Sequence, residues 1–324
     1  MILLASLFLL QLVNALPYAE KPVPQEVENR VFLMEESLPK TIIFQLDSLN
    51  NAGIIKAFGN SVFVLDYNPP ALKKIDLESQ KIVQKFGNGR GRGPGEYLNP
   101  TDFALSKNGA VWIADEPQSK ISVFTQKGDL SDDWIIEFTP YKLAGVTNNV
   151  AILGSLDPAI KFIDSSKTIY WTSHPQVENP RRWSNLITGF LLADSTSVYK
   201  ISNFAGTFSA YDKQGNNRFF RKLIDSDQKL KSNPISGLDY LAYQLDRSEL
   251  SFAVASGFIN KEEIHLLIQF YGNEPKQLID VYRTSDAEYL YSYKLDESVR
   301  SLTALENGDI IGLKSNEIII WERN

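Results

Sequence analysis

One unit of strand and turn recurs along this chain, and this repeat constrains the fold more than any other feature. The clearest copy is residues 101–130, TDFALSKNGAVWIADEPQSKISVFTQKGDL. A short apolar strand (102–105) precedes Asn108-Gly109, and the runs VWIAD (111–115) and KISVF (120–124) follow. Asn-Gly between two β-rich runs is a hairpin signal, because both residues tolerate a positive φ. Each copy of the unit therefore predicts antiparallel hairpins.

Six such units can be aligned on their second strand. Those strands are expected to begin near Val62, Val111, Val150, Val198, Ile264 and Ile310. The spacing between successive starts is 39 to 66 residues, and a four-stranded propeller blade takes about 40–50 residues. The fold class predicted is all-β, a six-bladed β-propeller of four-stranded antiparallel blades. A sandwich would not need the same turn at a fixed place in every unit.

Two irregularities in the repeat carry further expectations. The last unit ends with EIIIW and only three more residues, so it lacks a fourth strand. Because a closed ring removes exposed strand edges, we expect an N-terminal strand, Thr41–Leu46 or else Val31–Met34, to complete that blade. The longest spacing predicts an insertion at about 223–249, rich in polar residues, that forms an elaborated loop with a helical turn.

The N-terminus reads as a targeting segment. Residues 1–15 form an apolar run closed by Val13-Asn14-Ala15, which is typical of a signal peptide cleaved after Ala15, although no basic residue precedes the run. Residues 16–40, with three prolines near their start, are expected to be an extended leader. Residues 41–324 are expected to be a single domain. These assignments predict a secreted or periplasmic protein.

Composition excludes several classes of function. The chain carries 33 basic and 39 acidic residues and has a net charge of −6, so nucleic acid is not an expected partner. It has no cysteine, which excludes disulfides, thiolate metal sites and cysteine nucleophiles. The absence of cysteine and of any Asn-x-Ser/Thr acceptor favours a bacterial source. No segment beyond the N-terminal run is apolar enough to span a membrane, and we expect a monomer.

Residues 86–130 contain a distinctive series of short elements: Phe86-Gly87, Gly93-Pro94-Gly95-Glu96, Pro100, Asn108-Gly109, Ala114-Asp115 and Val123-Phe124. This series resembles one blade of the NHL repeat, a relative within the TolB-like superfamily of six-bladed propellers. Elsewhere only the rhythm of strands and turns matches the repeat. The resemblance implies a ring of six blades but no single activity, because such propellers act both as binding platforms and as enzymes.

Candidate ligand-binding residues lie in two connections between units. The glycine-rich segment 87–95 matches neither the dinucleotide nor the Walker phosphate motif, so we interpret it as a crossover between blades. Its arginines could nevertheless clamp a carboxylate or phosphate. The stretch 173–183 is polar and flanked by tryptophans, as recognition loops on rigid scaffolds often are. The candidates are Arg90, Arg92, Glu96, Arg181, Arg182 and Trp183.

Other conspicuous polar residues are expected to be structural. Asp66 and Asp115 each come at the end of the second strand of a unit, where a carboxylate is expected to cap the following turn through local hydrogen bonds. The only histidines are His174 and His265, which is too few for a histidine-rich metal site. No metal ligand and no catalytic residue is assigned.

Two functional hypotheses remain open. The first is a binding module that presents loops on one face of the ring to a protein, peptide or glycan, without a cofactor. The alternative is a Ca²⁺-dependent lactonase or esterase, similar to the gluconolactonase and strictosidine-synthase-like propellers, with its site in the central channel. A lyase of the peptidyl-amidoglycolate type also shares NHL-type repeats, but it requires histidine-bound zinc. Three or more Asp, Glu or Asn side chains converging in the channel would favour the metal enzyme.

Overall fold

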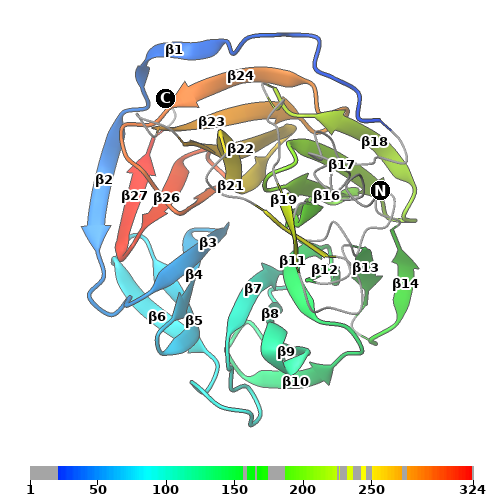
Figure 1. Cartoon of the computed structure of the whole chain (residues 1–324). Coiled ribbons are helices and arrows are strands. Elements are labelled where there is room, and N and C mark those ends of the chain that lie inside the picture. Colours follow the sequence, from blue (N-terminus) through cyan, green and yellow to red (C-terminus); the bar gives the residue numbers. More distant parts are fainter. Residues whose placement is uncertain are drawn as a thin grey trace, which may run out of the picture.

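A computed structural model describes residues 21–155, 159–164, 166–173, 187–224, 226, 232–235, 242–245, 250–271 and 276–322. Within these residues, six blades of four antiparallel strands each are arranged in a ring (Figure 1), and one of the blades carries a fifth strand. We call the space that the six inner strands enclose the central channel. The chain is therefore a six-bladed β-propeller, and the predicted fold class is confirmed.

Each blade is ordered from the channel outward. Blade 1 holds β3 (Ala52–Phe58), β4 (Ser61–Tyr67), β5 (Pro70–Asp76) and β6 (Lys81–Phe86). Blade 2 holds β7 (Pro100–Leu105), β8 (Val111–Asp115), β9 (Lys120–Phe124) and β10 (Leu130–Ile135), and blade 3 holds β11 (Pro140–Val146), β12 (Asn149–Gly154), β13 (Ile160–Ile163) and β14 (Ile169–Thr172). Blade 4 holds β15 (Gly189–Ala193), β16 (Ser197–Ser202), β17 (Thr207–Asp212) and β18 (Asn217–Lys222). Blade 5 holds β21 (Phe252–Asn260), β22 (Glu263–Phe270), β23 (Lys276–Arg283) and β24 (Tyr289–Lys294). Blade 6 holds β25 (Ser301–Ala304), β26 (Ile310–Lys314), β27 (Glu317–Trp321) and, as its outermost strand, β2 (Lys40–Gln45).

The six second strands predicted from the repeat are all present as β4, β8, β12, β16, β22 and β26. Each of them pairs with a strand on both sides. Such strands are buried on both faces, which is why they are continuous apolar runs rather than alternating ones; all five residues of β8 are buried, for example.

The ring is closed by the N-terminal strand that the incomplete last unit requires. Strand β2 pairs antiparallel with β27, with Phe44 opposite Ile318 and Gln45 opposite Glu317. The two strands lie side by side in Figure 1, blue beside red. Of the two segments considered from the sequence, the one at residues 41–46 therefore takes the closing position.

The described part of the predicted leader packs on the outside of the propeller. Strand β1 (Phe32–Ser37) pairs parallel with β24 and adds a fifth strand to blade 5 (Figure 1). Upstream, the backbone of Val23 exchanges hydrogen bonds of 2.9 Å with Phe220 and Lys222 at the outer edge of blade 4. The described part of this segment is thus attached to blades 4 and 5. The predicted signal peptide at 1–15 lies outside the described residues.

The hydrophobic core is divided among the contacts between blades. Six clusters of buried side chains lie between successive blades, from the pair of blades 1 and 2 round to the pair of blades 6 and 1. In the cluster between blades 6 and 1, Phe44 of β2 packs near Ile55 and Ile311. Burying one such side chain contributes about 1.5–3 kcal/mol, so the closing strand also seals an interface between blades.

The insertion after β18 contains a two-stranded antiparallel sheet of β19 (Ser232–Ile235) and β20 (Ala242–Leu245). Its described residues hold this hairpin and no helical turn. Among all described residues, no helix has the length and apolar character needed to cross a membrane.

Candidate functional site

The two ends of the central channel differ in what surrounds them. Because every blade runs from its inner strand outward, all six inner strands begin at one face of the ring and end at the other. The connections between blades therefore open on the first face, which we call the loop face; it includes residues 87–99 and the insertion with β19 and β20. The short turns between first and second strands lie on the opposite face, which we call the turn face.

The glycine-rich segment is the connection between β6 and β7, as predicted. Gly87 has a φ of +104°, and a Cβ at this position would lie 2.2 Å from the Tyr97 ring. A Cβ on Gly91 would lie 2.0 Å from the Glu96 carboxylate. The glycines thus allow a positive φ and close packing within the loop, which is a structural reason for their presence.

Three of the predicted ligand-binding residues lie in this loop. Arg90 and Arg92 are exposed, and Arg90 donates a hydrogen bond of 3.0 Å to the carbonyl of Leu98. The Glu96 carboxylate accepts a bond of 2.7 Å from the N–H of Gly93. Arg90 and Glu96 therefore contact their own loop. The other three candidates, Arg181, Arg182 and Trp183, lie outside the described residues, as does His174.

Asp66 and Asp115 have the structural role expected for them, but over a longer range than a local turn. Asp66 accepts hydrogen bonds from the N–H groups of Asn50 and Asn51 at 3.1 and 2.9 Å. In blade 2, Asp115 accepts equivalent bonds from Leu98 and Asn99 at 2.6 and 3.2 Å. Each carboxylate thus fixes the connection that leads into its own blade.

His265 lies inside blade 5 and away from the channel. Its side chain is fully buried, its ring stacks on Phe258 with centroids 4.6 Å apart, and Nε2 lies 3.2 Å from a carboxylate oxygen of Glu263. These contacts make His265 a packing residue.

The polar feature that the sequence did not reveal is a charged cluster inside the channel near the loop face. It lines a cavity of about 80 Å³ together with residues from the beginnings of the inner strands. The charged members are Lys56 of β3, Asp102 of β7, Lys142 of β11 and Arg300 immediately before β25. Four different blades therefore direct a charged side chain at the same short length of channel.

Asp102 and Lys56 form the centre of this cluster. The Lys56 Nζ lies 2.8 Å from Asp102 Oδ1, and it also donates to the carbonyls of Phe103 and Leu143. Asp102 Oδ2 accepts the N–H of Leu143 at 2.9 Å, and Oδ1 accepts the N–H of Phe103 at 2.8 Å. Burial lowers the pKa of Lys56; Asp102 opposes that change and nearby Lys142 adds to it. The pair links blades 1, 2 and 3 at their inner strands.

Tyrosines and apolar side chains complete the surroundings. Burial raises the pKa of Tyr67, and Asp102 and Tyr141 raise it further while Arg300 lowers it, so these groups share one electrostatic environment. Blades 4 and 5 contribute Phe190, Leu192 and Ala255 to the cavity lining. The channel is therefore cationic on one side and apolar on the other.

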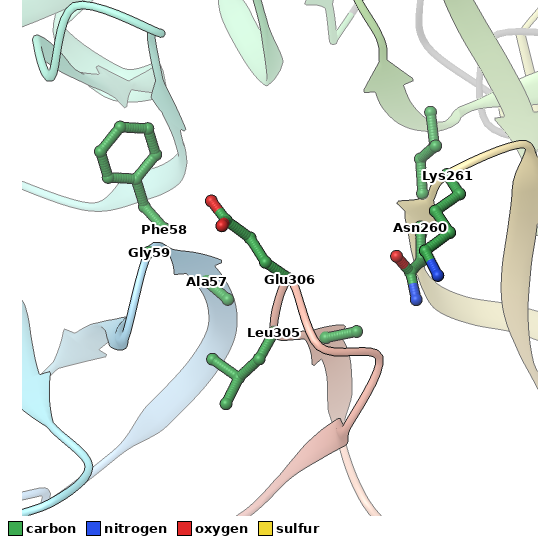
Figure 2. A pocket seen from close by; sticks show the side chains of 9 residues that line it. Ala57, Phe58, Gly59, Asn260, Lys261, Leu305 and Glu306 are labelled. Carbon is green, nitrogen blue, oxygen red and sulfur yellow. The ribbon is translucent and has the colours of Figure 1, made fainter. Parts of the chain in front are cut away.

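A second cavity, of about 400 Å³, lies at the turn face. It is formed by the ends of β3, β21 and β25 with their turns. Figure 2 shows Glu306 on one side of this cavity, Asn260 and Lys261 on the other, and Phe58 beyond Glu306. The charged side chains of this cavity, Lys261 and Glu306, are exposed and lie on short turns between strands.

Neither cavity offers the ligand set of a divalent cation. In the described part of the chain, no three His, Cys, Asp or Glu side chains come close enough to hold a metal ion. The acidic group of the channel cavity, Asp102, faces Lys56, Lys142 and Arg300 among the described lining residues. A Ca²⁺ site requires several converging oxygen ligands, whereas the described lining of the channel cavity has three cationic side chains and one carboxylate.

Comparisons with known proteins identify the fold but not a family. No family model matches the chain. Over 71 residues it is 37% identical to a probable peptidyl-alpha-hydroxyglycine alpha-amidating lyase of Caenorhabditis elegans, a match that covers 21% of this chain and 20% of that protein. The chain thus spans about a fifth of the length of this curated relative.

Solved structures align over most of the chain. A putative exported protein from Bacteroides fragilis matches with a TM-score of 0.59 and 10% identity, covering 93% of this chain and 98% of that one. A member of the DUF4221 family from Bacteroides vulgatus matches with a TM-score of 0.59 and 11% identity, covering 91% of this chain and 98% of that one. Streptogramin B lyase matches with a TM-score of 0.56 and 12% identity, covering 90% of this chain and 100% of that one. At such low identity these likenesses show the fold alone, and they agree with the six blades described above.

Proposed function

We propose that this protein is a secreted or periplasmic binding module whose site is the loop-face mouth of the central channel. The observation that carries the proposal is the convergence of Lys56, Asp102, Lys142 and Arg300, from four blades, on one cavity in the channel. Bringing charged side chains together in a concave site costs free energy, because they lose part of their hydration. Such clusters of charged groups are therefore typical of ligand-binding sites. The ligand class is a protein, peptide or glycan, part of which enters the channel.

The Ca²⁺-dependent lactonase or esterase has less support than the binding module. Its mechanism needs several carboxylate or amide oxygens converging in the channel. The channel cavity instead presents more cations than carboxylates among its described residues, and both oxygens of Asp102 already accept hydrogen bonds. We therefore propose binding without a metal cofactor.

We further propose that the blades derive from NHL-type repeats. The glycine-rich connection and the Asp115 anchor in blade 2 support this origin, as does the local similarity to a lyase over 71 residues. That similarity covers too little of the lyase to transfer its activity to this chain.

The site can be tested by blocking the channel. Ala255 is the extra residue at a bulge in β21, between Val254 and Ser256, and it is exposed in the channel cavity. Ala255→Trp is expected to fill the cavity without removing a ladder hydrogen bond. A matched control, Glu306→Trp, places the same bulk at the turn-face cavity.

The measurement is a thermal-shift screen of short peptides and sugars against the wild-type protein, followed by calorimetry on both variants. We expect bound compounds to lose affinity in Ala255→Trp and to keep it in Glu306→Trp. Binding that survives Ala255→Trp would place the site elsewhere. Ca²⁺-dependent turnover of lactones or esters by the wild-type protein would replace the binding module with the hydrolase.

A further inference from the structure

The channel cavity carries an excess of positive charge inside an acidic protein. The whole chain has a net charge of −6. The charged residues among the described lining of the cavity are three cations, Lys56, Lys142 and Arg300, and one carboxylate, Asp102. The local balance is therefore opposite in sign to the balance of the molecule.

Asp102 neutralises only one of these cations. Its Oδ1 receives the Lys56 ammonium at 2.8 Å, and its Oδ2 receives the N–H of Leu143 at 2.9 Å. The Asp102 side chain is 5% exposed, which leaves little of it for another partner. Among the described lining residues, no second carboxylate balances the remaining two cations, Lys142 and Arg300.

In the described part of the chain, Lys142 and Arg300 contact backbone carbonyls, and Lys142 also lies over the Tyr141 ring, 4.7 Å from its centre. The Lys142 Nζ lies 3.3 Å from the carbonyl oxygen of Thr101, and Arg300 Nη1 lies 3.3 Å from that of Ala52. Lys142 belongs to blade 3 and Arg300 to the entry of blade 6, which are opposite each other in a ring of six. An anion on the channel axis would therefore be approached from two sides.

The apolar wall of the cavity limits what can carry that anion. Phe190, Leu192 and Ala255 line the cavity from blades 4 and 5. A volume of about 80 Å³ is well below the several hundred Å³ of sites that enclose a whole ligand, so only one end of a ligand enters. A guanidinium pairs with a planar carboxylate by two parallel hydrogen bonds.

We propose that the channel binds the carboxylate end of a ligand whose adjoining group is apolar, with Arg300 and Lys142 as the anion-binding residues. This inference rests on the proposed binding function and specifies its chemistry. A carboxylate of this kind ends both a peptide with an apolar last residue and a short aliphatic acid. The shared feature is one planar negative group next to a small apolar body.

Four probes separate these sources and test the charge. N-acetylleucine represents a peptide end, N-acetylleucinamide is its neutral match, hexanoate represents an aliphatic acid, and hexyl phosphate offers a different anion. Calorimetry on the full chain should show binding of N-acetylleucine or hexanoate and at least about tenfold weaker binding of the amide, because a charge-assisted bond is lost. Which acid binds more tightly identifies the source.

Variants connect that preference to the two cations. Arg300→Gln and Lys142→Gln are each expected to weaken carboxylate binding about tenfold or more. Arg300→Lys keeps the positive charge but loses the two parallel donors of the guanidinium, so its carboxylate affinity should lie between those of the wild type and Arg300→Gln. Lys127→Gln is the matched control, because Lys127 is an exposed cation on the turn face. Circular dichroism confirms that each variant is folded, and the carboxylate affinity of the wild type should fall as salt rises.

The inference is overturned if the amide or hexyl phosphate binds as tightly as the carboxylates, if neither carboxylate binds, or if Lys127→Gln matters as much as the two channel variants. Its failure is distinguishable from failure of the proposed function. If Ala255→Trp abolishes the binding of ligands whose affinity does not depend on their charge, the channel remains the proposed binding site. The proposal that it binds a carboxylate would then be wrong.

Discussion

At the scale of single residues, buried charges hold the connections between blades in place. Lys73 and Asp66 are almost fully buried and lie 2.5 Å apart, and Lys73 also donates to the carbonyl of Ser48 at 2.6 Å. Ser48 belongs to the connection between β2 and β3, which leads from the closing strand into blade 1. In blade 2, Lys120 donates in the same way to the carbonyl of Glu96 at 2.6 Å. Two blades therefore share one device: a carboxylate and a lysine that together fix the incoming loop.

Asp66→Asn should destabilise the protein in a pH-dependent way. Burial alone would raise the pKa of Asp66, but hydrogen bonds from Lys73 and three backbone N–H groups outweigh it, and the net pKa is below 3.8. A depressed carboxyl pKa adds stability above its unfolded value of about 3.9, and this stability is lost as the pH falls through the folded-state pKa. We expect a loss of about 3 kcal/mol at pH 7. Urea unfolding between pH 7 and pH 2 measures it.

The difference between the wild type and Asp66→Asn should shrink as the pH falls below about 4. If the difference in the free energy of unfolding stayed constant over this pH range, Asp66 would stabilise the protein by its packing and not by its negative charge. Asp76→Asn is a useful control, because Asp76 also has a lowered pKa, from hydrogen bonds with Ser79, but lies at an exposed turn.

The sequence predicted the structural residues better than the site. Asp66 and Asp115 could be recognised because they follow the second strand of a repeat, where a local rule applies. Lys56, Asp102 and Lys142 each lie on an inner strand, among residues that read as ordinary strand positions. Their convergence depends on how six blades close into a ring, and one strand carries no signal of that geometry.

At the scale of elements, the N-terminal segment is a strap across two blades. Gln25 donates hydrogen bonds to the carbonyls of Lys222 and Ala287, at 2.7 and 3.0 Å, and so connects blade 4 to blade 5. Arg30 pairs with Asp280 of β23, whose side chain is fully buried, and its guanidinium lies 5.0 Å from the centre of the Phe270 ring. The strap therefore has a charged anchor inside blade 5 as well as the ladder of β1.

Arg30→Met should lower the free energy of unfolding by about 3–5 kcal/mol, because Asp280 would keep its charge in a buried place without this partner. Arg30→Met combined with Asp280→Asn should recover part of the loss. The exposed Lys21, on the same segment, provides Lys21→Met as a control with no expected change. Urea unfolding followed by tryptophan fluorescence gives all four values. A loss under about 1 kcal/mol for Arg30→Met would show that the strap is not anchored by this pair.

The strands of the repeat were predictable and the additions to it were not. Hairpin turns and apolar runs predict β4, β8, β12, β16, β22 and β26, because those strands are buried on both faces. The place of strand β1 was not predicted: Val31–Met34 was considered only as the strand that closes the last blade, whereas Phe32–Ser37 pairs with β24 at the edge of blade 5. Phe32, Leu33 and Met34 are exposed there, so the segment lacks a clear pattern of burial. The hairpin of β19 and β20 was not predicted either, because the polar insertion at about 223–249 was expected to form a loop with a helical turn.

At the scale of the whole molecule, the ring is held closed by contacts between the two ends of the described chain. Strand β2 supplies the outermost strand of blade 6, so about 270 residues lie between the two partners at the closure. The channel site depends on that closure, because Arg300 enters from blade 6 while Lys56 and Asp102 belong to blades 1 and 2. Opening the ring would separate the charges that we propose to bind a carboxylate.

A disulfide across the closure should stabilise the molecule as a whole. The N–H of Leu46 donates to the carbonyl of Asn316 at 3.0 Å. The next pair along the two strands, Gln45 and Glu317, is therefore a non-hydrogen-bonded pair, in which the side chains lie close together. The chain has no cysteine of its own, so Gln45→Cys with Glu317→Cys can form only one bridge. We expect the oxidised form to be about 2–4 kcal/mol more stable than the reduced form in urea, because the bridge restrains a long loop of the unfolded chain. If β2 did not close the ring, the two cysteines would stay reduced, and reducing agent would leave the unfolding curve unchanged.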